Sequence, residues 1–334
     1  MPGIARKLFP ILPRVGAAAL LLGAWATLPC AAFAQAYPAR PVSFIIGFPA
    51  GGSTDVSTRL MAAELGPALN QPVIVENRPG ASGVIAMNAI AKSPPDGYTA
   101  TVVFASISPI VPVSADPVVI EATRQLAFVS LMATLESMMT VSKDLPVDTL
   151  QQLIDYARAH PGQVNFGHGG TNGVYHLFGA LLARKAGVSM TDVPYKGDGP
   201  TIQALMGGEV QVAFSTVATA TPQVRAGRIK PLASMGAVRS PLFPDLPTVA
   251  ESGYPGFTVA LTQVIAVPPA TPAPVVDTLN AAAKKALTTP HIRDEFAKLG
   301  MVPRTTSPAE TTAQMREAID SLPRLMEQVK PIMK

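Results

Sequence analysis

The stretch of residues 42–55 constrains the fold more than any other part of the sequence. It reads Val-Ser-Phe-Ile-Ile-Gly-Phe-Pro-Ala-Gly-Gly-Ser-Thr-Asp, an apolar run, then a glycine turn, then three residue types that favour helix N-caps. A short run that is apolar on both faces is typical of a strand in a parallel sheet. A helix that starts after the turn directs its unpaired N–H groups and the positive end of its dipole into the loop. The stretch therefore predicts a strand, a loop suited to an anion, and a helix.

The same alternation continues along the first third of the chain. Hydrophobic periodicity predicts a helix over residues 55–69 and a strand over 73–76. A second helix, capped by Ser82, is expected to run to residue 91, and a third strand to cover residues 98–104. This β-α-β-α-β order is typical of a doubly wound parallel sheet.

The rest of the chain also alternates. Residues 105–127 give no clear pattern, and residues 125–141 are apolar enough for one long strand or two, which we expect to lead into a second α/β unit. Strands are predicted there at 164–166, 190–194, 210–214 and 229–234, and helices at 150–157, 174–185, 200–206 and 221–226. The last third predicts one more strand, at 258–267, and helices at 272–287, 291–299 and 308–329, which we expect to pack onto the first unit.

The N-terminus has the pattern of a secretory signal peptide. Three basic residues precede an apolar core at residues 15–28, and Ala-Phe-Ala at residues 32–34 is a suitable cleavage site. The core is shorter than the roughly 20 residues needed to span a membrane. We therefore expect residues 1–34 to be a signal peptide, cleaved near Ala34 or Ala36, and the mature protein to be periplasmic.

Removal of the signal peptide changes the composition that bears on function. The first 34 residues hold three basic and no acidic residues, so their loss takes the formal net charge from +4 to +1. Such a charge gives no reason to expect nucleic acid as a partner. The single cysteine, Cys30, is lost as well, so no disulfide is expected.

Two strand-to-helix loops are the candidate binding elements, one in each α/β unit. They cover residues 49–55 and 167–173. Ligands of open parallel sheets bind beyond the carboxyl ends of the strands, where both loops are predicted to lie. Facing each other, they would hold one anion with backbone N–H groups and two helix dipoles.

Other kinds of site fit the sequence poorly. Gly47 and Gly52 have the spacing of a phosphate-binding P-loop, but the required lysine is missing. His160, His168 and His176 recur every eight residues, which matches no helix or strand period, so no metal site is predicted. The hydrolase motif G-x-S-x-G is absent. No catalytic residue is therefore assigned, and no cofactor is expected.

Several further segments resemble a known family. Together with Tyr37-Pro38 and the stretch 48–55, they read Val-Glu-Asn-Arg-Pro-Gly-Ala at 75–81, Ala-Lys-Ser-Pro-Pro-Asp-Gly-Tyr-Thr at 91–99, Val-Pro-Tyr-Lys-Gly at 193–197 and Leu-Pro-Thr-Val-Ala-Glu-Ser-Gly at 246–253. In this order, over nearly the whole mature chain, they resemble the Bug-type receptors of tripartite tricarboxylate transporters.

The resemblance implies an α/β, two-lobed periplasmic binding protein fold, type II-like, with the ligand cleft between its lobes. Lobe 1 is expected to comprise residues 35–133 and 236–334, and lobe 2 residues 134–235. Such a receptor is expected to be a monomer that captures a small carboxylate, catalyses no reaction and hands the solute to the membrane permease. Family loops and strand-end side chains together give these candidate ligand-binding residues: Phe48, Ala50, Gly51, Gly52, Ser53, Thr54, Asp55, Ser106, Gly167, His168, Gly169, Gly170, Thr171, Gly173, Val174, Tyr195 and Thr216.

The second loop departs from the family pattern. His168 stands where a serine is common, and Gly173 and Val174 replace two small hydroxyl residues. With Tyr175, Phe48 and Tyr195 as possible cleft residues, we hypothesise a monocarboxylate ligand with an apolar or aromatic body. Two alternatives remain open at this level: a ligand sensor that docks on a signalling partner, and a periplasmic enzyme on the same fold.

Overall fold

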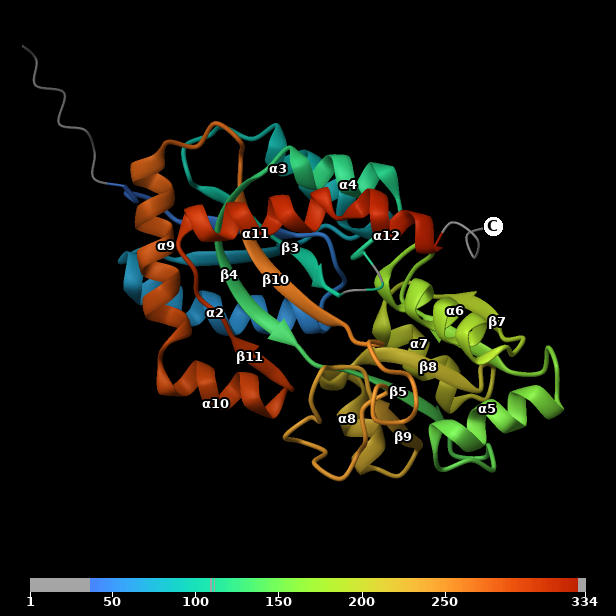
Figure 1. Ribbon diagram of the computed structural model, residues 1–334. Coiled ribbons are helices and arrows are strands. Elements are labelled where there is room, and N and C mark those ends of the chain that lie inside the picture. The colour runs from blue at the N-terminus through green and yellow to red at the C-terminus, as the bar shows by residue number, and fades with distance from the viewer. Residues whose placement is uncertain (1–36, 109, 111, 330–334) are drawn as a thin grey trace, which may run out of the picture. The chain divides into compact units, whose positions relative to one another are not determined.

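Two mixed β-sheets, each flanked by helices, organise the chain (Figure 1). The computed structural model describes residues 37–108, 110 and 112–329. The predicted signal peptide lies outside these residues. No helix in the described part of the chain is both long and apolar enough to cross a membrane. The two-sheet arrangement confirms the predicted α/β class.

The larger sheet has six strands in the order β11-β4-β10-β3-β1-β2. The bounds of its strands are β1 (Val42–Ile46), β2 (Val73–Asn77), β3 (Thr99–Ile107), β4 (Ala127–Leu135), β10 (Ala260–Val267) and β11 (Met301–Pro303). β1 pairs in parallel with β2 and β3, as the sequence predicts. β10 lies antiparallel between β3 and β4, so a strand from the last third of the chain completes the sheet.

Helices cover both faces of the larger sheet. α2 (Ser53–Leu69), α9 (Ala273–Leu287) and α10 (Pro290–Lys298) lie on one face, where Phe44, Met61 and Phe296 are fully buried. On the other face, α3 (Val84–Ala91), α4 (Pro117–Arg124) and α11 (Pro308–Asp320) pack around Ile90 and Val103. α12 (Leu322–Val329) follows α11. Burial on both faces explains why β1 reads as a continuous apolar run.

The smaller sheet has five strands in the order β7-β6-β8-β5-β9. The bounds of its strands are β5 (Ser137–Ser142), β6 (Asn165–His168), β7 (Thr191–Pro194), β8 (Val212–Thr216) and β9 (Ile229–Ser234). α5 (Leu150–Ala159) and α6 (Val174–Ala186) pack on one face, and α7 (Asp198–Met206) and α8 (Val217–Arg225) on the other. β6, β7 and β8 are parallel, so their carboxyl ends share one edge of the sheet.

The chain passes from the larger to the smaller sheet at Glu136. β4 ends at Leu135 and β5 begins at Ser137, and Figure 1 shows the two strands following one another. The chain returns through residues 235–259, where the Met235 amide donates to the Ser137 carbonyl oxygen at 2.9 Å. The apolar stretch 125–141 is thus two strands in two different sheets.

Local structure differs from the sequence prediction in several segments. Residues 105–127, which gave no pattern, contain α4, whose N-cap Asp116 accepts a hydrogen bond from the Val118 amide. Ser82 does not cap a helix: it has a φ of 53° in a 3-10 turn, and α3 starts after Gly83. β6 runs two residues further than predicted, so His168 ends a strand instead of lying in a loop.

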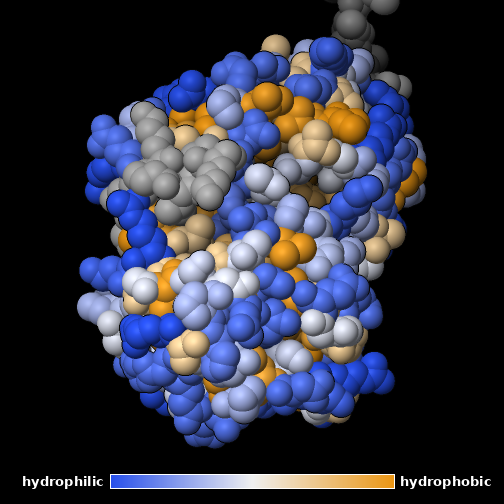
Figure 2. Space-filling model, turned by 90° about the vertical axis from the view of Figure 1, so that its right-hand side faces the viewer, coloured by the Kyte–Doolittle hydropathy of each residue, from blue (hydrophilic) through white to orange (hydrophobic). Residues whose placement is uncertain are grey.

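The face of the molecule shown in Figure 2 is mostly hydrophilic. On the face shown in Figure 2, hydrophobic residues gather beside a recess, while the rest is largely covered by polar side chains. Most apolar side chains of the two sheets are buried.

Candidate functional site

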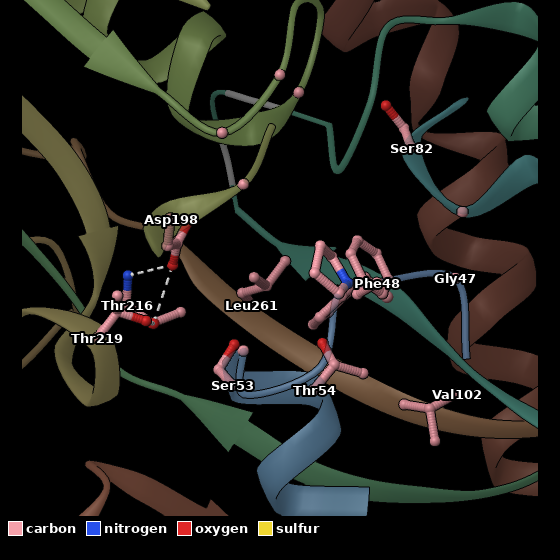
Figure 3. Close-up of a pocket in the computed structure, with 18 of the residues that line it drawn as sticks. Gly47, Phe48, Ser53, Thr54, Ser82, Val102, Asp198, Thr216, Thr219 and Leu261 are labelled. Atoms are coloured by element: carbon pink, nitrogen blue, oxygen red, sulfur yellow. Dashed lines mark hydrogen bonds between the residues drawn. The ribbon is translucent and has the colours of Figure 1, made fainter. Parts of the chain in front are cut away.

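A cavity of about 550 Å³ lies among the loops that join the strands of both sheets to their helices. The larger sheet contributes residues 47–54, the turn at Ser82 and Gly83, and side chains of β3 and β10. The smaller sheet contributes residues around 169–174, 196–200 and 216–222. In Figure 3, Asp198 and Thr216 lie on one side of the pocket and Phe48 and Val102 on the other, with Leu261 between them.

Asp55 stabilises the conformation of the first loop through hydrogen bonds. One of its carboxylate oxygens accepts the Gly51 amide at 2.9 Å, and the other accepts Arg59 Nε at 2.8 Å and Asn77 Nδ2 at 3.0 Å. Asn77 also donates to the Phe48 carbonyl oxygen at 3.0 Å. Although burial alone would raise it, the pKa of Asp55 is held below its ordinary value by these hydrogen bonds and by the charge of Arg59. The ionised Asp55 carboxylate therefore stabilises the shape of the loop. Its hydrogen bond with the Gly51 N–H makes this donor unavailable to a ligand.

The N-terminus of α2 faces the cavity without a side-chain cap. Its N-cap is Gly52, in an extended conformation, and Ser53 and Thr54 of the first turn line the cavity. The first amides of a helix have no carbonyl acceptor within the helix. The start of α2 therefore presents unpaired N–H donors and a positive dipole end to the cavity.

The start of α6 has the same form on the opposite side. Its N-cap, Gly173, is extended and lacks a side-chain cap, and Gly173, Val174 and Tyr175 line the cavity. The loop before it is held by the segment between β3 and α4, because the Ala115 amide donates to the Asn172 carbonyl oxygen at 2.8 Å and Ser114 forms a bridge with Gly173. Two open helix starts, one from each sheet, thus border one cavity.

A carboxylate already accepts hydrogen bonds at the start of α8. Asp198, the first residue of α7, lines the cavity, and its Oδ2 accepts the Thr216 amide and the Thr216 hydroxyl, both at 2.9 Å. Burial raises the pKa of Asp198 against the opposing effect of the Thr216 hydrogen bonds. Within the described structure, the second carboxylate oxygen of Asp198, Oδ1, accepts no hydrogen bond. This corner of the cavity favours a ligand group that donates a hydrogen bond.

The remaining wall is largely apolar. Phe48 and Phe104 make an edge-to-face contact with ring centroids 5.2 Å apart, and Val102 and Leu261 lie beside them along the cavity. Tyr175 is buried, and its hydroxyl shares a hydrogen bond of 2.9 Å with Ser137. Among the described residues that line the cavity, Lys196 supplies the basic side chain. A ligand with an apolar body and few polar groups matches this lining.

The structure brings together eleven of the residues predicted from sequence around this cavity. They come from both loops and from the end of β8: Phe48, Ala50, Gly51, Gly52, Ser53, Thr54, Gly169, Gly170, Gly173, Val174 and Thr216.

Six predicted residues do not line the cavity. Asp55 lies beneath the first loop, and Gly167 and His168 belong to β6, where His168 is fully buried. Ser106 pairs with Leu261 in the larger sheet, and Thr171 is exposed. Tyr195 donates to Glu209 at 3.2 Å, outside the cavity.

Sequence reasoning missed several lining residues. Asp198 lies in the first turn of α7, three residues after Tyr195, which was predicted as a ligand-binding residue from its place at a strand end. Leu261 of β10, Leu299 just before β11 and Met301 of β11 also line the cavity, although these segments lie far from the loops in sequence. No local sequence signal identifies these three residues.

Comparison with known proteins places the chain in a family. A family model described as tripartite tricarboxylate transporter family receptor matches residues 57–330. Protein BugT of Bordetella pertussis is 34% identical over 287 residues, which cover 86% of this chain and 88% of BugT.

Solved structures agree with this match. An R. palustris protein with adipate has a TM-score of 0.80 and 30% identity, over 88% of this chain and 98% of that chain. MatC from Rhodopseudomonas palustris with bound malate has a TM-score of 0.76 and 29% identity, over 86% of this chain and 99% of that chain. The two-lobed periplasmic binding protein fold is thus shared with proteins of similar length. The chain belongs to the tripartite tricarboxylate transporter receptor family.

Proposed function

We propose that this protein captures a small carboxylate in the cavity between the two sheets and delivers it to a tripartite tricarboxylate transporter permease, without catalysis. The observation that carries the proposal is the pair of open helix starts, α2 and α6, on one cavity. Helix N-termini bind anions through their free N–H groups and dipoles. We place the ligand carboxylate between Ser53 of α2 and Val174 of α6.

We propose further that the two sheets are the centres of two lobes that close on the ligand. Their bounds are residues 35–133 plus 236–334 for lobe 1 and residues 134–235 for lobe 2. The short connection at Glu136 and the return segment 235–259 are where the chain passes between the sheets, which supports these bounds.

The ligand class follows from the rest of the cavity. Phe48, Val102, Phe104 and Leu261 favour an apolar body. A second ligand carboxylate near Asp198 would meet a like charge or require a proton, whereas a hydroxyl, amide or ammonium group would donate to its open Oδ1. We therefore propose a monocarboxylate with an apolar or aromatic body and a hydrogen-bond donor. This differs from the adipate and malate found with the two R. palustris proteins.

Isothermal titration calorimetry tests the ligand class. The panel contains hydroxylated aromatic monocarboxylates, unsubstituted aromatic monocarboxylates, adipate, malate and the uncharged amides of the aromatic acids. We expect the hydroxylated monocarboxylates to bind most tightly and the amides not to bind. Tight malate or adipate binding with no response to the monocarboxylates would refute the ligand class while leaving the receptor function intact. Native mass spectrometry of freshly purified protein identifies any ligand retained from the cell, and its conversion on incubation would contradict the absence of catalysis.

A further inference from the structure

Two histidines and an aspartate form a cluster behind the second loop, outside the cavity. Nε2 of His168 and Nε2 of His176 lie 3.5 Å and 3.6 Å from the same oxygen, Oδ2 of Asp192. The candidate ligand atoms of the three side chains all lie within 4.8 Å of one another. The two imidazole rings are 4.7 Å apart between centroids.

Regular secondary structure positions all three side chains. His168 is the last residue of β6, and Asp192 lies on the neighbouring parallel strand β7, in register with Phe166. Residues 166 and 168 alternate onto the same face of the sheet, so Asp192 shares that face with His168. His176 is in the first turn of α6, which packs on this face. The cluster is therefore held by a sheet and a helix, and only its sequence spacing is irregular.

The distances are unsuited to hydrogen bonds within the cluster. An N–H···O hydrogen bond spans about 2.7 to 3.2 Å, and a separation of 3.6 Å is too long. Two ligand atoms that each lie about 2.1 Å from one zinc ion at the tetrahedral angle are about 3.4 Å apart. The separations of 3.5 and 3.6 Å between each histidine nitrogen and the Asp192 oxygen match the edges of such a site.

His168 gives the strongest sign of a missing partner. Its side chain is fully buried, and its Nε2 has no hydrogen-bond partner within the described structure. Its Nδ1 lies 3.0 Å from the Gly170 carbonyl oxygen and 3.3 Å from the Gly170 amide nitrogen. The contact with the carbonyl oxygen is the shorter one, and only a protonated Nδ1 satisfies it. A proton on Nδ1 that is donated to this carbonyl leaves the lone pair of Nε2 directed at His176 and Asp192. Metal-binding histidines commonly donate their second ring N–H to a backbone carbonyl in this way.

Charge and access also suit a cation. Burial lowers the pKa of both His168 and His176, against the opposing effect of Asp192, and so favours the neutral imidazoles that bind metal ions. The Asp192 side chain is 46% exposed, so an ion can reach the cluster from solvent on that side. Imidazole and carboxylate together are donors typical of zinc and other late first-row divalent ions.

We propose that His168, His176 and Asp192 form a three-ligand site for Zn²⁺, with the fourth position open to water. One existing contact must change when the ion binds. The Asn172 amide donates to Nδ1 of His176 at 3.1 Å, so this nitrogen is unprotonated and the proton of the neutral ring is on Nε2. Zinc binding moves that proton to Nδ1 and turns the Asn172 amide away. Because Gly170 and Gly173, on either side of Asn172, line the cavity, zinc binding is expected to alter ligand affinity, and the ligand to alter zinc affinity by the same factor.

Titration with zinc chloride tests the site. The protein is prepared without a polyhistidine tag, stripped with EDTA and titrated by calorimetry near pH 7.5. We expect one zinc per chain with micromolar affinity or tighter, and at least a tenfold loss in Asp192→Asn, His168→Ser and His176→Gln. Asp192→Asn is the decisive variant because Asp192 is half exposed and its replacement is nearly isosteric. The matched control is His291→Ala, a histidine on α10 outside the cluster, which is expected to bind zinc as the unchanged protein does.

A zinc-edge anomalous map of crystals soaked in zinc identifies the ligands independently. We expect its main peak at both Nε2 atoms and the Asp192 carboxylate. Absence of zinc binding at micromolar concentrations, an unchanged affinity in Asp192→Asn, or an anomalous peak at other residues would overturn the proposal. The test is independent of the carboxylate ligand, because zinc alone is the probe.

Discussion

Two helices that begin at the cavity, α2 and α6, differ from three helices that begin away from it. The remote helices α5, α10 and α11 start with Thr149, Thr289 and Ser307, and each of these side chains accepts an amide hydrogen bond of its own first turn. The cavity helices α2 and α6 start with Gly52 and Gly173 and have no side-chain cap. The starts of α2 and α6 thus lack the interaction that stabilises the starts of α5, α10 and α11.

The omission has a stability cost that ligand binding can offset. An N-cap side chain contributes about 0.5 to 2 kcal/mol relative to alanine, whereas its replacement by glycine costs only about a few tenths of a kcal/mol. Glycine therefore keeps most of the stability while leaving the N–H groups open to an external anion. At the start of α8, by contrast, Asp198 supplies the anion from within the chain. The cavity accordingly has one end built for a carboxylate and another that already contains one.

The largest expected effect comes from giving α2 a cap of its own. In Gly52→Asp, the new carboxylate would accept the first-turn N–H groups and repel the ligand carboxylate. Hydrogen bonds to a charged group are worth about 1.5 to 3 kcal/mol each, so the loss of two should weaken binding by about a hundredfold or more. Calorimetry with the best carboxylate of the panel measures this.

Gly52→Ala is the matched control. The φ of Gly52 is −74°, which any residue adopts, and an added Cβ would lie 3.3 Å from the Pro49 carbonyl oxygen. The alanine variant therefore tests the added carbon without the charge, and we expect it to lose less than about tenfold in affinity. Equal losses in both variants would mean that the start of α2 is not the carboxylate site.

The second effect concerns the anion that shapes the first loop. Asp55→Asn removes a buried carboxylate that accepts three hydrogen bonds, and should cost about 1 to 3 kcal/mol of unfolding free energy at pH 7. Because the pKa of Asp55 is lowered in the folded state, its contribution is complete above its unfolded value of about 3.9 and is lost as the pH falls below it. Urea unfolding between pH 3 and pH 7 should show the two proteins converging in acid.

Asp144→Asn, an exposed acid away from the loop, is the control for this series, and we expect its unfolding free energy to follow that of the unchanged protein. A gap between the unchanged protein and Asp55→Asn that stays constant with pH would show that the ionised carboxylate is not what holds the loop.

The third prediction concerns Asp198, the carboxylate at the other end of the cavity. Asp198→Asn removes the internal anion but can keep an acceptor for the Thr216 hydrogen bonds. Relative to a hydroxylated monocarboxylate, we expect adipate and malate to gain about tenfold in affinity, because one like-charge contact is removed. Competition calorimetry measures the ratio, with Asp144→Asn again as control. An unchanged ratio would place Asp198 outside the ligand's reach.

Much of this arrangement could be predicted from the sequence, because it depends on local patterns. The apolar run of β1, the glycines after it and the helical stripe of α2 are contiguous, and the strand, loop and helix lie where they were expected. The second loop was misplaced by two residues. Gly167 resembles a loop residue in sequence, but its backbone pairs with Val193 of β7, and a Cβ there would lie 3.0 Å from Thr201. Sheet pairing and close packing extended the strand through His168.

Features that depend on distant segments could not be predicted in this way. Asp192 and His176 meet His168 only because β7 pairs with β6 and α6 folds over both, so an eight-residue spacing that matches no single element still forms a cluster. β10 likewise brings Leu261 to the cavity from the last third of the chain. Periodicity is a property of a single helix or strand and carries no information on contacts between distant elements.

The smallest expected effect is at a remote helix start. Ser307 and Glu310 form a capping box on α11, in which the Ser307 hydroxyl oxygen accepts the Glu310 amide at 3.2 Å. Ser307→Ala should lower the unfolding free energy by about 1 kcal/mol and leave carboxylate affinity unchanged. Ser321→Ala, at the other end of the same helix, removes a hydroxyl that donates only to the Ala318 carbonyl oxygen, and should cost less. A loss of ligand affinity in Ser307→Ala as large as that expected in Gly52→Asp would contradict the comparison. It would mean that the start of α11 also contributes to ligand binding, and not to stability alone.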